Sequence, residues 1–414
     1  MLLWHAGPDM DDATALLVPV MGRARPGLTS ALCHILANLG ARIIDMEQVV
    51  IRDRLILGLL ISAPDEGAAR SELAAAGSEL GVSVELEQIA RRRPDYGHKR
   101  HYVTLLGQPL RAEAIAAVTG RIAACGANID RIVQLSRYPI TSFELMVSGD
   151  AERLRAELVA EAARQRIDVA VQPATLYRRA KRLIVLDVDS TLVQGEVIEL
   201  LAEHAGCADR VADITDRAMA GELDFAAALH ERVALLEGLP VSALDHVREH
   251  LQLTPGARTL VRTLRRLGFV LAIVSGGFSQ VTDDLARRHG LDYARANTLE
   301  VAGGRLTGRL TGPIVDRAGK AAALEHFAEL SGVPLSQTVA VGDGANDLDM
   351  LNRAGLGIAF NAKPVVRAAA DTAVSVPYLD AILFLLGITR EEIEAADADD
   401  PDYVAVPLPA VDGD

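Results

Sequence analysis

The hydrophobic and polar positions of the first 175 residues follow the same pattern twice. In each copy a strand that ends in glycine, over residues 15–22 and 102–107, precedes an amphipathic helix, and two alternating strands follow. Both helices carry apolar residues at spacings of three and four. The order strand, helix, strand, strand, helix, strand predicts two split βαβ, ferredoxin-like domains over residues 12–92 and 101–176.

This repeat resembles the ACT domain, a small regulatory module that binds amino acids. The resemblance is clearest in Gly22-Arg23-Ala24-Arg25-Pro26-Gly27-Leu28, where the first strand meets its helix. The second copy has Gly107-Gln108-Pro109-Leu110 at this place and lacks the Arg-Pro-Gly-Leu segment. The resemblance implies an amino-acid effector and a homodimer formed through paired sheets. A purely structural role, such as a dimerisation platform, stays open for the pair.

From residue 182 to 390 the pattern changes to apolar strands that alternate with helices. Four short apolar runs, at residues 183–186, 270–274, 338–341 and 356–359, are typical of buried parallel strands. They predict a Rossmann-like, doubly wound α/β sheet. Helical patterns alone fill residues 195–268, which we interpret as an inserted helical cap. A β-hairpin is expected over residues 299–307, with a Gly303-Gly304 turn.

Composition narrows the possible functions. The 414 residues carry a formal net charge of -14, which argues against a nucleic-acid-binding protein. No apolar stretch reaches the roughly 20 residues of a membrane helix. The three cysteines, Cys33, Cys125 and Cys207, lie far apart, which fits a reducing cytoplasm. We therefore expect a cytoplasmic protein without membrane or nucleic-acid partners. A leader over residues 1–11 and an acidic tail over residues 391–414 are expected to be disordered.

Four polar motifs follow strands or begin helices in the predicted sheet. Asp187 and Asp189 follow the strand at 183–186, and Ser275-Gly276-Gly277 follows the strand at 270–274. Lys320 is expected at the start of a helix. Ligands of open α/β sheets bind at the carboxyl ends of the strands, so we expect these groups to meet there. The fourth motif, after the strand at 338–341, is Gly342-Asp343-Gly344-Ala345-Asn346-Asp347.

Together the motifs predict a site for a phosphate and a metal ion. Neighbouring carboxylates repel each other unless a cation compensates, and Mg²⁺ prefers such oxygen ligands. A hydroxyl and free N–H groups at Ser275 and Gly276 can hold phosphoryl oxygens, and Lys320 can add positive charge. A carboxylate in line with the phosphorus can act as a nucleophile that forms an aspartyl-phosphate. The neighbouring acid can exchange protons with the leaving group and with water.

With these motifs, residues 183–390 resemble the phosphatases of the haloacid dehalogenase superfamily. The resemblance implies that Asp187 is the nucleophile and a Mg²⁺ ligand, and that Asp343 is a further ligand. It implies that Asp189 is the general acid and base, with its backbone carbonyl on the metal ion. It implies that the phosphoryl group is held by Ser275, Gly276, Lys320 and Asn346. It also implies that Asp347 orients Lys320 or a metal-bound water, and that Thr191 supports the site.

The cap resembles that of the phosphoserine phosphatases, in residues 193–196, 217–221, 224–225 and 232–240. The resemblance implies that Glu196 contacts the substrate's ammonium group and that Arg232 binds its carboxylate. Met219 and Phe225 would close the cap over the substrate. The implied reaction is Mg²⁺-dependent hydrolysis of O-phospho-L-serine, and the implied effector of the ACT-like domains is L-serine.

Three alternatives stay open at this point. The same chemistry could serve another small phosphate, such as phosphohomoserine or phosphothreonine, in a phosphatase or phosphotransferase. The chain could instead be an amino-acid-sensing binding protein with an inactive phosphatase domain, although the intact Asp187, Asp189, Lys320 and Asp343 argue against it. Phosphorylated protein side chains are a third class of substrate, which a closed helical cap should exclude.

Overall fold

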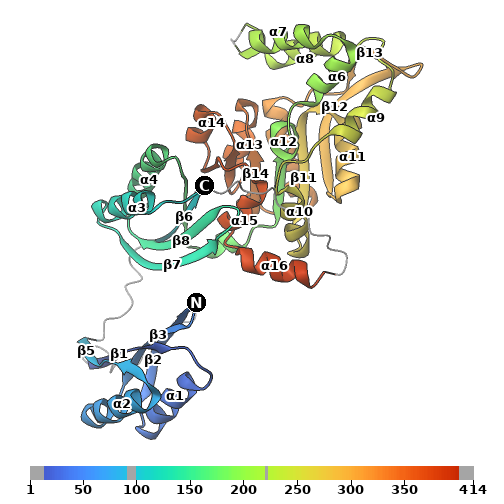
Figure 1. The fold of residues 1–414 in the computed structure, drawn as a ribbon. Helices are drawn as coiled ribbons and strands as arrows, with labels where there is room; N and C mark the ends of the chain where they lie inside the picture. The colour runs from blue at the N-terminus through green and yellow to red at the C-terminus, as the bar shows by residue number, and fades with distance from the viewer. Residues whose placement is uncertain (1–13, 91–98, 220–221, 401–414) are drawn as a thin grey trace. The chain divides into compact units, whose positions relative to one another are not determined.

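The computed structural model describes residues 14–90, 99–219 and 222–400. The chain divides into two compact units, residues 1–97 and 98–414 (Figure 1). The expected leader over residues 1–11 lies outside the described residues. Among the described helices, none is both long and apolar enough to span a membrane.

The first unit holds one ferredoxin-like domain. Its antiparallel sheet has the order β2-β3-β1-β4, and β5 also pairs with β1. Leu28 and Leu32 of α1 and Leu73 of α2 pack on Leu57 and Leu59 of β3. The elements are β1 (Thr14–Arg23), α1 (Leu28–Asn38), β2 (Arg42–Ile51), β3 (Arg54–Ser62), α2 (Glu66–Leu80), β4 (Val82–Val84) and β5 (Glu87–Ala90).

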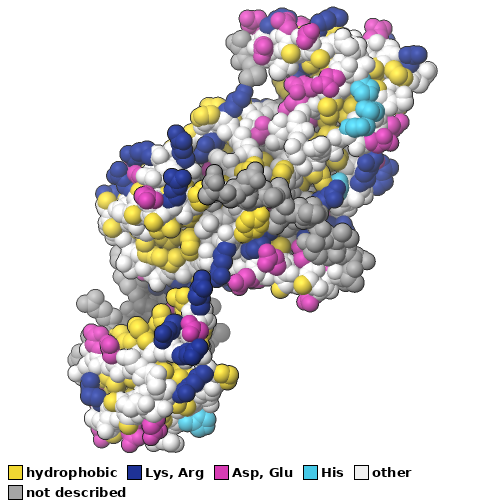
Figure 2. All heavy atoms as spheres, in the orientation of Figure 1, with side chains coloured by type: hydrophobic (Ala, Val, Ile, Leu, Met, Phe, Trp, Pro, Cys, Tyr) yellow, Lys and Arg dark blue, Asp and Glu magenta, His cyan; other side chains and the backbone are white. Residues whose placement is uncertain are grey.

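The edge strand β2 leaves apolar side chains in solvent. Met46, Val49 and Ile51 are each about half exposed, at 47%, 53% and 58%. Hydrophobic side chains are also visible on the face of this unit in Figure 2. An exposed apolar edge strand is a template for pairing with another chain.

The second unit begins with a second ferredoxin-like domain, whose sheet has the order β7-β8-β6-β9. This strand order corresponds to that of the first domain, so the predicted pair of ACT-like folds is confirmed. Leu105 and Val103 of β6 pack under Val118 of α3 and Leu154 of α4. The elements are β6 (Arg100–Gly107), α3 (Ala112–Ala124), β7 (Asn128–Ser136), β8 (Thr141–Ser148), α4 (Ala151–Gln165), β9 (Asp168–Pro173) and the short helix α5 (Leu176–Arg179).

The rest of the second unit is the predicted α/β domain. Its seven-stranded sheet has the order β13-β12-β11-β10-β14-β15-β16, parallel except for the β12–β13 hairpin. Gly303 and Gly304 form the predicted hairpin turn with φ of 58° and 76°, which favour glycine. The strands are β10 (Leu183–Asp187), β11 (Val270–Phe278), β12 (Tyr293–Ala302), β13 (Arg305–Thr311), β14 (Thr338–Gly342), β15 (Gly357–Phe360) and β16 (Thr372–Val374).

Helices cover both faces of this sheet, because successive residues of each strand point to opposite sides. Ile184 and Leu186 of β10 pack in one core with α10 and α11, whereas Leu183 and Val185 pack in another with α12 and α13. The helices that follow the cap are α10 (Ala257–Arg266), α11 (Ser279–His289), α12 (Arg317–Leu330), α13 (Leu348–Arg353), α14 (Pro364–Ala369), α15 (Ile382–Leu385) and α16 (Arg390–Ala398).

The cap is helical, as expected, and follows the first strand of the sheet. It consists of α6 (Val197–Ala205), α7 (Ala208–Met219), α8 (Phe225–Ala234) and α9 (Ser242–His250). α7 and α8 lie against each other at one end of the sheet (Figure 1). Asp224 begins α8 by accepting a hydrogen bond from the N–H of Ala227 at 2.7 Å.

The second ferredoxin-like domain shares a hydrophobic core with the α/β domain. Leu106, Leu135 and Ile140 are buried in the same cluster as Ile382 and Phe384 near the end of the chain. Polar contacts add to this packing, since Gln172 donates from Nε2 to the carbonyl of Leu385 at 2.9 Å and Asp168 accepts from the N–H of Ser375. The two domains therefore form one body.

The expectation of a disordered tail from residue 391 is wrong for its first part. Residues 390–398 form α16, which Thr389 and Glu392 begin as a capping box. Ile393 is buried, and Asp397 forms ion pairs with Arg262 and Arg266 of α10. Residues 401–414 lie outside the described residues.

Candidate active site

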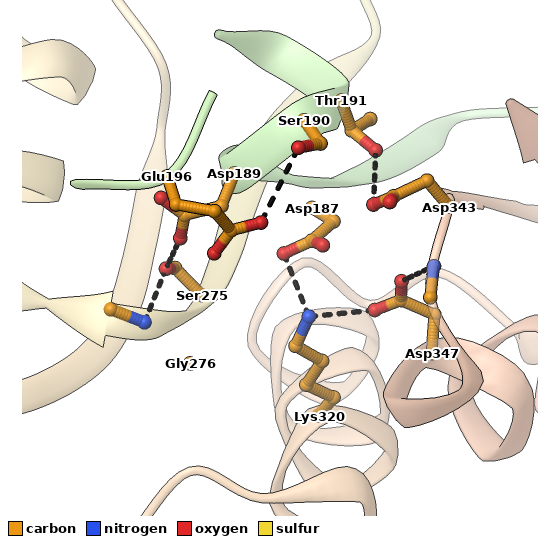
Figure 3. Close-up of polar contacts among 12 residues, drawn as sticks. Asp187, Asp189, Ser190, Thr191, Glu196, Ser275, Gly276, Lys320, Asp343 and Asp347 are labelled. Carbon is orange, nitrogen blue, oxygen red and sulfur yellow. Dashed lines mark hydrogen bonds and ion pairs between the residues drawn. The ribbon is translucent and has the colours of Figure 1, made fainter. Parts of the chain in front are cut away.

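The first acidic motif forms a tight turn at the carboxyl end of β10. Ser190 has a φ of 56°, a left-handed conformation that is uncommon for a residue other than glycine, and its N–H donates to the carbonyl of Gly195 at 3.1 Å. The Asp189 carboxylate accepts a hydrogen bond from the N–H of Val197 and another from the Ser275 hydroxyl, each 2.8 Å long. These bonds fix the Asp189 carboxylate between the cap and the end of β11 (Figure 3).

Lys320 joins two buried carboxylates. Its Nζ atom lies 2.7 Å from Asp187 Oδ1 and 2.7 Å from Asp347 Oδ1, and the side chain is only 1% exposed (Figure 3). Asp316 begins α12 by accepting the N–H of Gly319, which places Lys320 in the first turn, as predicted. Burial opposes the charge of Lys320, but the two carboxylates outweigh it and raise its pKa.

The acidic cluster carries more negative charge than Lys320 balances. Asp187, Asp343 and Asp347 each offer a carboxylate oxygen, and these oxygens all lie within 4.8 Å of one another. Burial, reinforced by Asp347, raises the pKa of Asp187 well above its usual range and that of Asp343 to about 6. Thr191 donates to Asp343 at 3.2 Å.

Two of these carboxylates, Asp187 and Asp343, are predicted metal ligands, and Asp347 is an addition. The carboxylate of Asp189 points to Ser275, and the ligand predicted from Asp189 is its backbone carbonyl. Asp347 accepts the N–H of Gly344 at 2.9 Å, so its own loop fixes its second oxygen. A bound cation would therefore lie among carboxylates from the first and fourth motifs.

The Ser275-Gly276-Gly277 motif lies in the last part of β11, so the expectation that it follows the strand is wrong; an irregularity in strand pairing occurs here, between Val274 and Phe278. The segment is held from both sides. Gly277 donates its N–H to the Ser275 hydroxyl at 2.7 Å. Asn297 is buried and donates from Nδ2 to the carbonyl of Gly276 at 2.8 Å, while its Oδ1 accepts the N–H of Val315 at 2.7 Å. This part of β11 thus has a fixed backbone, and Gly276 lines the same cavity as Asp187 and Lys320.

The cap brings Glu196 and Arg232 to the same space. Burial, reinforced by Asp189 and Asp343, raises the pKa of Glu196 to about 7. Arg232 donates from Nε to the carbonyl of Ala228 at 3.3 Å, and burial lowers its pKa. Phe225 of the cap lies close to Gly276, because a Cβ atom on this glycine would lie 3.0 Å from Phe225 Cζ. α7 ends at Met219, whose side chain lies outside the described residues.

A cavity of about 660 Å³ collects these groups, a size that suits a small ligand. It is lined by nine of the predicted residues: Asp187, Asp189, Glu196, Phe225, Arg232, Gly276, Lys320, Asp343 and Asn346. Ser275, Thr191 and Asp347 stand behind this lining and contact its members through the bonds given above.

Comparison with known proteins places the chain in a family. Residues 184–352 match the haloacid dehalogenase-like hydrolases, and residues 14–87 and 99–172 each match an ACT domain. The phosphoserine phosphatase of Streptomyces coelicolor is 58% identical over 94% of this chain and 96% of its own. That of Mycobacterium tuberculosis is 52% identical over 97% of this chain and 100% of its own.

The chain belongs to the phosphoserine phosphatase family. A solved structure of a probable phosphoserine phosphatase from Vibrio cholerae agrees, with 34% identity, a TM-score of 0.57, and coverage of 72% of this chain and 89% of its own. The resemblances inferred from the four motifs and from the repeat are thereby confirmed. As a member of this family the chain is an enzyme, a hydrolase of phosphate monoesters.

Sequence reasoning missed several residues that support the phosphoserine phosphatase site. Asn297 lies within β12 and braces Gly276, but an asparagine in a strand has no local signal of this role. Thr254 donates to the carbonyl of Thr191 at 2.7 Å and so holds the first turn from behind. Glu199 and Thr215 also line the cavity. Glu199 follows Glu196 by one helical turn, a spacing that could have identified it.

Proposed function

We propose that the chain hydrolyses O-phospho-L-serine to L-serine and phosphate in a Mg²⁺-dependent reaction. The observation that carries this proposal is one cavity lined by two kinds of groups. Asp187, Lys320 and Gly276 suit a phosphoryl group, and Glu196 and Arg232 from the cap line the same cavity. Phosphoserine carries a phosphate, an ammonium group and a carboxylate, and each of these has a chemically matching partner in the lining.

The proposed roles follow from these contacts. An oxygen of Asp187 attacks the phosphorus, and the bond between phosphorus and the serine oxygen breaks. Asp189, which Val197 and Ser275 hold in place, donates a proton to the departing serine oxygen. Water then attacks the phosphorus of the aspartyl-phosphate, Asp189 takes its proton, and phosphate leaves. Lys320 neutralises charge beside Asp187 throughout.

The remaining phosphoryl contacts belong to the same proposal. The backbone of Gly276 and the side chain of Asn346 line the cavity beside Lys320 and would bind phosphoryl oxygens. Ser275 would act through its hydroxyl, and Asp347 would orient Lys320 through the ion pair. Thr191 would support Asp343. On the cap, Phe225 and Met219 would cover the substrate.

The donor set fits Mg²⁺. Asp187 and Asp343 offer carboxylate oxygens within 4.8 Å of each other, which suits a small cation that prefers oxygen. Burial, together with the neighbouring charge of Asp347, raises the pKa values of both groups, and a cation beside them would favour their ionised forms. Asp187 and Asp343 would hold the ion, with the backbone carbonyl of Asp189 as the third protein ligand. When bound, the ion would supply positive charge to the transferring phosphoryl group.

The test is phosphate release from O-phospho-L-serine, with Mg²⁺ and with EDTA. O-phospho-L-threonine, phosphohomoserine and p-nitrophenyl phosphate serve as competing substrates. We expect rapid release that EDTA abolishes and that strongly prefers phosphoserine. Equal rates on all four would remove Glu196 and Arg232 from substrate selection. Asp187→Asn should abolish turnover and leave the thermal melt intact, and substantial residual turnover would exclude Asp187 as nucleophile.

We also propose that an amino acid, with L-serine as the first candidate, binds the ACT domains and lowers activity. The two matches to ACT domains support this role. The shared core between the second ACT domain and the α/β domain offers a path for the effect. The exposed apolar strand β2 supports a homodimer built through the first ACT domain.

Calorimetric titration of serine into the full chain, with turnover measured over the same concentrations, tests the regulatory proposal. Unchanged kinetics together with no heat of binding would contradict feedback by serine. Sedimentation of the full chain tests the dimer, for which Val49→Asp on β2 is the disruptive variant.

A further inference from the structure

A second cavity, of about 350 Å³, lies beside α10 and the end of α11, away from the catalytic carboxylates. Its lining is strongly basic, although the whole chain has a net charge of -14. Among the described residues, one carboxylate, Asp400, belongs to the lining. The basic side chains are Arg258, Arg262, Arg265, Arg266, Arg288 and His289.

These arginines are not all neutralised. Arg262 and Arg266 form ion pairs with Asp397, and Arg288 pairs with Asp284. In the part of the chain that the structure describes, no carboxylate lies within ion-pair distance of Arg258 or Arg265. Within the described residues, Arg258 and Arg265 therefore keep charge that no ion pair neutralises, although the adjoining cavity that shares Arg258 is also lined by Glu249, Asp380, Glu394 and Asp397.

The positive charge of the cavity affects the pKa of His289. His289 ends α11 and lines the cavity. Burial lowers its pKa, and Arg258 and Arg288 lower it further, because their charges oppose protonation of the ring. This agrees with a local excess of cations that the single pairing of Arg288 with Asp284 does not remove.

The inner wall of the cavity is apolar and lies against the catalytic turn. Leu192 and Leu253 line it, and Leu192 is the last residue of the turn that begins after Asp187. Behind that wall Thr254 holds the carbonyl of Thr191. The cavity thus combines free guanidinium groups with a hydrophobic surface, a pairing that suits an organic anion.

We propose that this cavity binds a diphosphate group, either free or within a nucleotide. Arginine binds phosphate in a bidentate manner, and Arg258 and Arg265 lie about 10 Å apart along one helix, so their long side chains can each hold one phosphoryl group. The apolar wall beside them would accept the organic part of a nucleotide. The site is separate from the proposed catalytic cavity.

Calorimetric titration of the full chain in EDTA, at roughly physiological ionic strength, tests the site. The probes are inorganic pyrophosphate, ADP and adenosine. The pocket variant is Arg258→Glu with Arg265→Glu, and Arg258→Glu alone is made in case the pair does not fold. The matched control is Arg287→Glu with Arg309→Glu, which changes charge equally at side chains that are 74% and 77% exposed.

We expect the pocket variants to lose at least tenfold in affinity for pyrophosphate or ADP, while the control keeps the wild-type affinity. Turnover of phosphoserine should persist in both, since the catalytic cavity is untouched. Tighter binding of ADP than of pyrophosphate would identify a nucleotide as the ligand, and equal binding would identify free diphosphate. Absence of binding to the wild type, equal losses in pocket and control variants, or adenosine binding as tightly as ADP would each overturn the proposal.

Discussion

Glu196 should make substrate affinity depend on pH. Its pKa is raised to about 7 in the ligand-free cavity, so the carboxyl group changes its charge near neutral pH. An ammonium group bound beside it favours the ionised form and lowers this pKa. Substrate binding then releases a proton, and affinity rises with pH until Glu196 is fully ionised.

The size of the effect follows from the pKa. With a value of about 7, the ionised fraction grows about tenfold between pH 6 and pH 8, and this factor is the upper limit of the expected fall in KM. Mg²⁺ would weaken the repulsion from Asp343, but burial is the larger cause. The inflection in the presence of Mg²⁺ is therefore expected between the usual value of 4.5 and about 7.

The assay is KM for O-phospho-L-serine from about pH 4.5 to 8.5, a range that covers the expected inflection, in wild type and in Glu196→Gln. The substrate phosphate titrates with a pKa near 6, but it does so in both proteins, so the ratio of the two profiles isolates Glu196. Loss of the charged contact should raise KM by about 10- to 100-fold, since hydrogen bonds to charged groups contribute roughly 1.5–3 kcal/mol. Glu199→Gln removes an equal charge from the same cavity and should keep the pH dependence.

Parallel profiles for wild type and Glu196→Gln would refute this reasoning, because the pH dependence would then belong to another group. An equal loss of pH dependence in Glu199→Gln would refute it as well. A rise in KM for p-nitrophenyl phosphate that matches the rise for phosphoserine would show that Glu196 does not act on the ammonium group.

Three further outcomes follow from the site. Asn297→Ala leaves the Gly276 carbonyl without its buried donor, so kcat/KM should fall at least tenfold. A thermal melt should still show a folded protein. Unchanged kinetics would show that Asn297 does not position Gly276. Lys320→Met leaves the buried carboxylates of Asp187 and Asp347 without their cation. Urea unfolding in EDTA should therefore show a free energy of unfolding lower by about 3–5 kcal/mol, and an unchanged free energy of unfolding would contradict this. Mg²⁺ at 100 times its Kd should stabilise the wild type by about 2.7 kcal/mol but should not stabilise Asp343→Asn. Equal shifts in the melting temperature of the two proteins would exclude the acidic cluster as the Mg²⁺ site.

Local patterns were sufficient for the fold and for most of the site. Apolar runs such as 183–186 form strands because each is buried on both faces of the sheet. The catalytic groups lie at the carboxyl ends of those strands, so their order along the chain predicts that they meet. The ACT-like repeats were recognisable because the same periodicity occurs twice.

Residues that act through distant partners could not be found in this way. Asn297 is 21 positions from Gly276 in sequence, and its strand would look the same with another polar residue. The core that the second ACT domain shares with the α/β domain is a comparable case. From the sequence, Ile140 and Phe384 are expected to be ordinary core residues of two separate domains. Neither contact leaves a local pattern.

The acidic tail shows how charge can mislead when its partners are remote. The run of acids from residue 391 resembles a disordered segment because, taken alone, the acids repel each other. In the fold Asp397 lies between two arginines of α10, and Ile393 is buried below it. The arginine run of α10 is explained by the same contact, but only in part. Arg262 and Arg266 form ion pairs with Asp397 of α16, whereas Arg258 and Arg265 line the cavity without such a pair among the described residues. This division depends on the packing of α16 beside α10, which the sequence of neither helix predicts by itself.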